Sequence, residues 1–277
     1  MSTTEDLTTD DGTRLMLRSW PQPAERRASM LIVHGLGEHS GRYEHVGAHF
    51  AAAGFAVSAL DLRGFGGSGG KRASVRSFAE YLEDLEPAVD LMLASPEPTI
   101  LYGHSLGGLV ALAYALWGRR APDLLVLSAP TLEAAIPGWK RVAARLLGRL
   151  VPGAALPNDI RGDQLSTDPA VGEAYFADPL VVTRTTARFG AEWLRAMGKA
   201  RGSLAHLTVP TLVIHGAEDT LVPPAISEPL AAIPGVTRVL LPGLRHECHN
   251  EDGGRVALAA IGAWLDRNLP ASPQDTG

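Results

Sequence analysis

The stretch Gly103-His104-Ser105-Leu106-Gly107 reads G-x-S-x-G and joins an apolar run to a run of small residues. Residues 99–102 are typical of a buried strand, and residues 106–113 are typical of a tightly packed helix. The flanking glycines leave room for a sharp turn from which one side chain projects. The stretch therefore predicts a strand–turn–helix unit of an α/β fold and makes Ser105 a candidate nucleophile.

A nucleophilic serine in such a turn needs an acid and then a base later in the chain. Asp219 follows the apolar run 211–215, and His246 follows the run 238–241. The carboxyl ends of parallel strands meet at one edge of a sheet, so we expect these side chains to lie near Ser105. His246 would then be the general base, and Asp219 would orient its ring. The neighbouring Glu218 could replace Asp219 on these grounds alone.

Two backbone N–H groups are candidates for an oxyanion hole. Leu106 follows the serine at the start of the predicted helix, where N–H groups point outward. Leu36 lies in the glycine-rich loop 34–39, after a predicted strand that ends at Val33. A plain glycine-rich turn is the alternative interpretation of that loop.

Composition limits the class of protein. The chain has 277 residues, of which 45% are hydrophobic and 20% charged, as in water-soluble globular proteins. A net charge of −5 argues against nucleic acid as a partner. The polar, acidic start lacks the features of a signal peptide, and Cys248 is the single cysteine. We therefore expect a cytoplasmic protein without internal disulfides.

The alternation of strand and helix patterns outlines the domain organisation. It predicts an α/β core over residues 1–130 and 208–270, with an antiparallel start at the turn Asp10-Asp11-Gly12. Between 131 and 207 the pattern becomes helical, with proline and glycine breaks and no clear strand, which predicts an inserted cap. Residues 271–277 are predicted to form a flexible tail.

Two other patterns favour cofactor sites but lack the context that these sites require. Residues 64–69 read G-x-G-x-x-G, yet they continue as a loop where a dinucleotide site would open a helix. His45 and His49 are spaced for a shared metal but lack the H-E-x-x-H glutamate and a third ligand. We expect no metal and no organic cofactor.

Several motifs together resemble the monoacylglycerol lipase family of the α/β-hydrolases, over most of the chain. They are HGLGEHSGRY at 34–43, DLRGFGGS at 61–68, GHSLGG at 103–108, GAED at 216–219, HECHNE at 246–251 and, in the cap, YFADPL at 175–180. The resemblance implies an α/β-hydrolase fold with a mostly parallel central sheet, helices on both faces and an inserted helical cap. It also favours Asp219 over Glu218 as the acid.

The resemblance further implies hydrolysis of monoacylglycerols to free fatty acid and glycerol, through an acyl-enzyme on Ser105. It suggests a polar pocket for the glycerol head, formed by Glu38, Arg42, His104, Tyr175 and His249. The simpler alternative is that Glu38 and Arg42 only pair with each other. A lysophospholipase or a general carboxylesterase is the other enzymatic interpretation. A non-catalytic receptor that binds ligands with the same fold is an interpretation of a different class.

The cap contains an amphipathic stretch. Its apolar stripe consists of Val142, Leu146, Leu147, Leu150 and Val151, and the opposite side carries Arg141, Arg145 and Arg149. One interpretation is a helix that contacts a membrane or micelle surface and makes the protein peripheral to the membrane. The other, which we favour on the sequence, is a helix packed over an acyl tunnel with its arginines in water.

Overall fold

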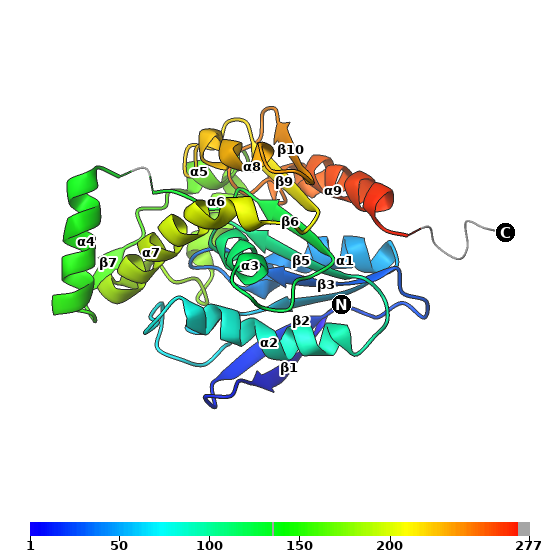
Figure 1. Ribbon diagram of the computed structural model, residues 1–277, viewed down its shortest axis with the longest axis horizontal. Coiled ribbons are helices and arrows are strands. Elements are labelled where there is room, and N and C mark those ends of the chain that lie inside the picture. The colour runs from blue at the N-terminus through cyan, green and yellow to red at the C-terminus, as the bar shows by residue number, and fades with distance from the viewer. Residues whose placement is uncertain (135, 271–277) are drawn as a thin grey trace.

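An eight-stranded sheet runs through the protein in the order β1-β2-β4-β3-β5-β6-β9-β10 in the computed structural model (Figure 1). The structure describes residues 1–134 and 136–270, so the predicted tail at 271–277 lies outside the described residues. The first two strands pair antiparallel, and the neighbours from β4 to β10 pair parallel. The strands are β1 Thr3–Thr8, β2 Arg14–Ser19, β3 Ala28–Val33, β4 Phe55–Leu60, β5 Thr99–His104, β6 Leu124–Ser128, β9 Thr211–Gly216 and β10 Val236–Leu241.

The central strands β3, β5, β6 and β9 are buried throughout because helices cover both faces of the sheet. In β3, Leu31 and Val33 join the apolar core on one face, while Met30 and Ile32 join the core on the other. On the first face lie α2 Ala79–Leu93 and α3 Leu106–Leu116, and on the second lie α1 Glu44–Ala52 and α9 Arg255–Asn268. The short helix α8 Glu228–Ala231 precedes β10. The prediction of an α/β-hydrolase architecture is confirmed.

The chain between β6 and β9 supplies the helices α4 Gly138–Leu150, α5 Gly162–Leu165, α6 Pro169–Ala177 and α7 Ala187–Ser203. It also contains a two-stranded antiparallel ribbon, β7 Ala155–Pro157 with β8 Arg184–Thr186. The sequence predicts no clear strand here, so this ribbon is a correction. Strands of three residues are too short to show a period-2 pattern. The predicted cap boundaries, 131 and 207, stay a proposal.

Helix α4 contradicts the favoured interpretation of its apolar stripe. Val142, Leu146 and Leu150 are 54%, 55% and 75% exposed, so they do not pack over a tunnel. The helix instead contacts α7 through small residues, since a Cβ added at Gly148 would lie 2.6 Å from the Cβ of Ala191. Figure 1 shows α4 at one end of the molecule, away from the sheet. Close backbone contact between two helices leaves the large side chains outside.

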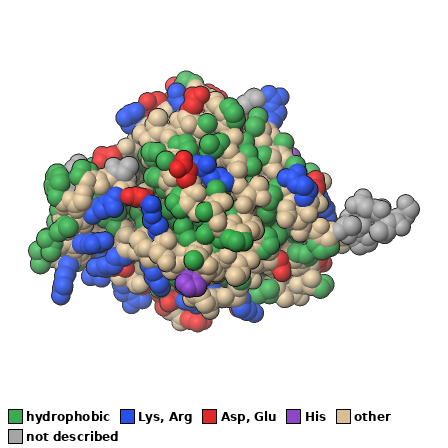
Figure 2. Space-filling model, turned by 45° about the horizontal axis from the view of Figure 1, so that its top comes forward, with side chains coloured by type: hydrophobic (Ala, Val, Ile, Leu, Met, Phe, Trp, Pro, Cys, Tyr) green, Lys and Arg blue, Asp and Glu red, His purple; other side chains and the backbone are tan. Residues whose placement is uncertain are grey.

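The surface around α4 combines two kinds of side chain. Figure 2 shows hydrophobic side chains and lysine or arginine side chains gathered next to each other at the end of the molecule where α4 lies. In residues 1–134 and 136–270 no helix has both the length and the apolar character of a membrane span.

Candidate active site

Ser105 lies between β5 and α3 in a strained backbone conformation, with φ 52° and ψ −112°. Its N–H donates to the carbonyl of Ser128 at 2.8 Å, and its carbonyl accepts from the N–H of Leu109 at 3.1 Å. A Cβ at Gly103 would lie 2.2 Å from the carbonyl oxygen of Gly107, so glycine is required there. These contacts hold a nucleophile-type turn in place.

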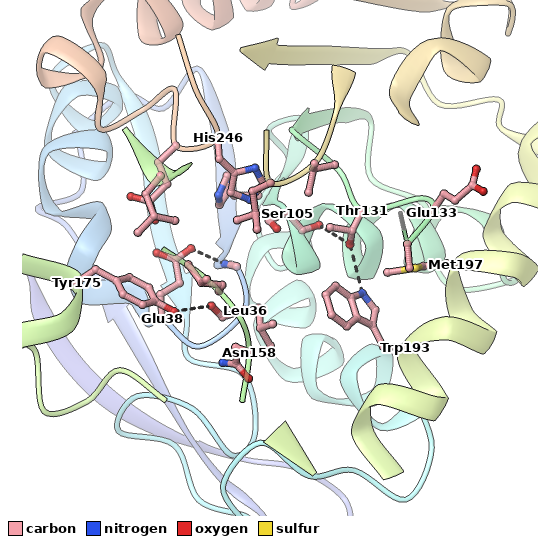
Figure 3. Close-up of a pocket in the computed structure, with 18 residues that line it drawn as sticks. Leu36, Glu38, Ser105, Thr131, Glu133, Asn158, Tyr175, Trp193, Met197 and His246 are labelled. Atoms are coloured by element: carbon pink, nitrogen blue, oxygen red, sulfur yellow. Dashed lines mark hydrogen bonds between the residues drawn. The ribbon is translucent and has the colours of Figure 1, made fainter. Parts of the chain in front are cut away.

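Asp219 and His246 meet at the carboxyl edge of the sheet, beyond β9 and β10. His246 Nδ1 lies 2.7 Å from Asp219 Oδ2, and the two side chains are 3% and 0% exposed. The other carboxylate oxygen accepts from the backbone N–H groups of Leu221 and Val222 at 2.9 and 2.8 Å. This pairing assigns the hydrogen to Nδ1 of His246 and leaves Nε2 free to accept a proton from Ser105. Figure 3 shows His246 and Ser105 next to each other in the pocket.

The charges of the pair support each other. Burial alone would raise the pKa of Asp219, but the charge of His246 and the hydrogen bonds hold that pKa well below its usual range. Burial lowers the pKa of His246, but the charge and hydrogen bond of Asp219, together with the charges of Glu247 and Glu38, outweigh burial and raise this pKa above its ordinary value. Asp219 is therefore ionised and favours a proton on His246.

A second histidine, His215 on β9, touches the same carboxylate. Its Nε2 lies 3.2 Å from Asp219 Oδ2 and 2.7 Å from the carbonyl oxygen of Val222. Its Nδ1 lies 3.0 Å from the hydroxyl of Ser227. The sequence prediction did not include His215, although its position at the end of the apolar run before Asp219 could have indicated it.

A cavity of about 660 Å³, including its open mouth, lies above Ser105 (Figure 3). Core loops and cap both line it, the cap through α5, α6, α7, the segment that contains Asn158 and the residues that follow β6. The described lining residues are Gly35, Leu36, Glu38, His104, Ser105, Thr131, Glu133, Ala134, Asn158, Ile160, Leu165, Tyr175, Trp193, Met197, Leu221, Val222, His246 and Glu247. No residue of α4 is among them.

The cavity has two different sides. Figure 3 shows Tyr175 and Glu38 on one side of Ser105, and Trp193, Met197 and Glu133 on the other. On the second side, Trp193 Nε1 donates to Thr131 Oγ1 at 3.3 Å, and the Glu133 carboxylate is paired with Arg141 and Arg201. The second side is suited to a hydrocarbon chain, and the first to a polar group.

The loop after β3 supplies one of the two predicted oxyanion donors. Leu36 lines the cavity, and its carbonyl oxygen accepts from the Tyr175 hydroxyl at 3.2 Å, so its peptide is anchored to the cap. Gly37 has φ +81°, and its carbonyl accepts from the N–H of Val182 at 2.7 Å. Leu106 opens α3 directly after Ser105. The roles of both N–H groups stay predictions.

Glu38 and Arg42 do pair, and a third residue joins them. Arg42 Nη1 donates to Glu38 Oε2 at 2.6 Å, and its two Nη atoms each donate to one oxygen of Glu247 at 2.7 Å. Glu38 Oε1 also accepts from the N–H of Gly35 and from the Tyr43 hydroxyl, at 2.6 and 2.7 Å. The cluster ties the oxyanion loop to the histidine loop. The sequence analysis missed the part of Glu247 in it.

The other residues predicted for a glycerol pocket lie at different depths. Tyr175 and His104 line the cavity, whereas Arg42 and His249 do not. His249 is fully buried, with its ring stacked on Tyr43 and its edge toward His104, both at 4.7 Å between ring centres. Among the described residues neither of its ring nitrogens has a hydrogen-bond partner. The structure thus places His249 behind the wall that it was predicted to form.

Burial sets the charge of these histidines. It lowers the pKa of His104 to about 3 and holds the pKa of His249 well below its ordinary value. Both rings are therefore neutral at pH 7. In the part of the chain that the structure describes, no three His, Cys, Asp or Glu side chains are grouped to hold a metal ion.

Comparisons with known proteins agree with this geometry. Residues 24–253 match the family described as serine aminopeptidase, S33. The chain is 37% identical to a monoacylglycerol lipase of Mycolicibacterium smegmatis over 270 residues, covering 93% of this chain and 95% of that protein. It is 32% identical to human monoglyceride lipase, covering 78% and 73%. The crystal structure of Paleococcus ferrophilus monoacylglycerol lipase superposes with a TM-score of 0.83 at 32% identity, covering 92% of this chain and 99% of that one.

Proposed function

The chain belongs to the serine aminopeptidase S33 family, within its monoacylglycerol lipase branch, and from this premise we propose that it hydrolyses monoacylglycerols to fatty acid and glycerol. The observation that carries the proposal is the cavity above Ser105, which has one polar side and one largely apolar side. A glycerol head and an acyl chain need these two environments on opposite sides of the ester carbon.

The reaction begins with attack of Ser105 Oγ on the ester carbonyl carbon. His246 Nε2 accepts the hydroxyl proton, and the Asp219 carboxylate stabilises the resulting imidazolium. The N–H groups of Leu36 and Leu106 donate to the oxyanion that develops on the carbonyl oxygen. When the tetrahedral intermediate collapses, the bond from carbon to the glycerol oxygen breaks and His246 gives that oxygen its proton. The products of this step are free glycerol and an acyl ester on Ser105.

Water completes the cycle by the same route. His246 takes a proton from water as the water oxygen attacks the acyl carbon, and the second intermediate collapses with return of the proton to Ser105 Oγ. The fatty acid leaves, and the triad regains its initial protonation. Each proton passes through His246 Nε2, so the Asp219 contact at Nδ1 serves both halves of the reaction.

We extend the proposal to a transient contact between α4 and a membrane or micelle surface, which would make a cytoplasmic protein peripheral to the membrane. The exposed Trp139, Val142, Leu146 and Leu150 give α4 an apolar surface, with Arg145 and Arg149 on the same helix. Amphipathic helices of this kind lie in the headgroup region of lipid bilayers.

The decisive experiment measures the purified protein on a monoacylglycerol, on lysophosphatidylcholine and on short nitrophenyl esters, with fluorophosphonate labelling in parallel. We expect the monoacylglycerol to have the highest kcat/KM and the label to depend on Ser105. Lysophosphatidylcholine or a short ester as the best substrate would point to the lysophospholipase or carboxylesterase alternative. Equal labelling of wild type and Ser105→Ala would leave only the receptor interpretation.

A further inference from the structure

The charged residues on the cavity wall are all of one sign, apart from the catalytic histidine. Among the described lining residues there are three glutamates, Glu38, Glu133 and Glu247, and neither a lysine nor an arginine. Low-dielectric walls with charges of one sign strengthen the electric field inside a cleft. The composition of this wall therefore affects which substrates can enter.

On the polar side of the cavity, the negative charge exceeds the positive charge. Arg42 is the cation that neutralises Glu38 and Glu247, and it makes hydrogen bonds to both carboxylates at 2.6–2.7 Å. One guanidinium shared by two carboxylates leaves one negative charge in excess. The side chains of Arg42, Glu38 and Glu247 are 9%, 2% and 3% exposed, so water screens this charge poorly.

The other ionisable groups near the polar side of the cavity do not cancel the excess negative charge. The ring of His104 is neutral at pH 7, because burial lowers its pKa to about 3. Asp219 and His246 supply no compensating positive charge, because Asp219 is ionised and the reactive form of His246 is neutral. Glu133 lies on the other side of Ser105, with Arg141 and Arg201 as its partners. The excess negative charge thus faces the position that the glycerol head would occupy.

We propose that this wall selects neutral or cationic head groups and rejects phosphate-bearing ones, with Glu247 as a specificity-determining residue. The inference rests on the proposed esterase function and names the class of substrate within it. Glycerol hydroxyls can donate to the Glu38 and Glu247 carboxylates, whereas a phosphate has only acceptor oxygens at full ionisation and carries about −1.5 to −2 charges at pH 7. Entry into the cavity would remove water from the phosphate and place it against a wall that is also negatively charged.

The test compares two substrates that share acyl chain, ester bond and carbon skeleton: a 1-monoacylglycerol and the same molecule with phosphate on its terminal hydroxyl. For the wild type we expect kcat/KM to be about 100-fold higher for the neutral ester. We expect Glu247→Gln to reduce this ratio about tenfold, because it removes one charge and keeps the shape of the side chain. Equal ratios in wild type and variant would overturn the assignment of Glu247.

A matched control removes the same charge elsewhere. Glu173 is an exposed carboxylate on α6, so Glu173→Gln should leave the ratio unchanged. An equal drop in Glu173→Gln and Glu247→Gln would show that net charge acts at long range, and would overturn the local inference.

A third substrate separates charge from size: the acyl ester of 3-trimethylammonio-1,2-propanediol, whose head is bulky and cationic. We expect its kcat/KM to stay within about tenfold of the neutral ester. If both bulky heads are rejected equally, size is the cause and the inference fails. If the neutral ester itself is not hydrolysed, the proposed function fails instead, so the two failures are distinguishable.

Discussion

The core buries its large apolar residues, whereas the cap helix α4 exposes them. Every residue of β3, β5, β6 and β9 is buried, and helices cover both faces of these strands. In α4 the side chains of Trp139, Val142, Leu146 and Leu150 are exposed, and Gly148 contacts α7. The strands are continuous apolar runs and α4 has an apolar stripe of helical period, but neither pattern tells what the apolar residues contact. The core face meets other parts of this chain, whereas the α4 face is exposed among the residues that the structure describes.

This difference separates two kinds of function. The core fixes the positions of reacting atoms, since Ser105, Asp219 and His246 are each held by hydrogen bonds within a few residues of a strand of the sheet. The cap contributes wall residues such as Tyr175 and Trp193, and an exposed surface on α4. Changes in the core should therefore abolish chemistry, and changes in the cap should alter access to substrate.

The largest effect is expected at the nucleophile. Ser105→Ala should lower kcat by about 10⁴- to 10⁶-fold, because the attacking oxygen is lost while the cavity remains. Hydrolysis of a soluble nitrophenyl ester measures it, with thermal unfolding as the control for folding. A loss below tenfold would mean that the core does not carry the chemistry.

Asp219→Asn should lower kcat by about 10⁴-fold and change the pH profile. Activity requires neutral His246, so in the wild type kcat/KM should fall with decreasing pH through a pKa that Asp219 raises above its ordinary value of about 6.5. Without that charge, burial lowers the pKa of His246, and the acidic limb should move to lower pH. An acidic limb that stays in place in the variant would contradict this coupling.

In the cap, the double change Leu146→Gln and Leu150→Gln should weaken binding to phospholipid vesicles about tenfold, because it removes apolar surface from the exposed face of α4. Co-sedimentation with vesicles measures it. Turnover of a soluble short ester should stay unchanged, since no α4 residue is among the described residues of the cavity wall. If turnover of the soluble ester fell as much as vesicle binding, α4 would be acting on the core.

The smallest effect is expected where α4 packs on α7. Gly148→Ala should destabilise this contact by about 1 kcal/mol, because the new methyl group would lie 2.6 Å from Ala191 Cβ and 2.8 Å from the Ala187 carbonyl oxygen. Hydrogen exchange of the α4 amides measures it. Gly138→Ala is the matched control, since its added Cβ meets nothing within 4 Å. Equal protection in the two variants would mean that α4 does not depend on close packing.

The sequence predicted most of the sheet because each central strand is a short apolar run between turns, which only a two-sided core can bury. The strand predicted at 99–102 lies within β5, and the run at 211–215 is β9 without its last glycine. It missed β7 and β8, whose three residues each carry too little pattern. Of the site, order and spacing predicted Ser105, Asp219 and His246 as a set, and the structure brings Asp219 and His246 into contact.

The sequence by itself determined the strand–turn–helix at Ser105, since only glycine fits at positions 103 and 107 beside a residue with φ 52°. Such signals are local, so neighbouring residues suffice to predict them. Tertiary structure alone decided that Arg42 is shared by Glu38 and Glu247, that His215 contacts Asp219, and that α4 faces outward. These contacts join residues distant in the chain or depend on which face packs inward, and no local pattern encodes the distance between two loops after folding.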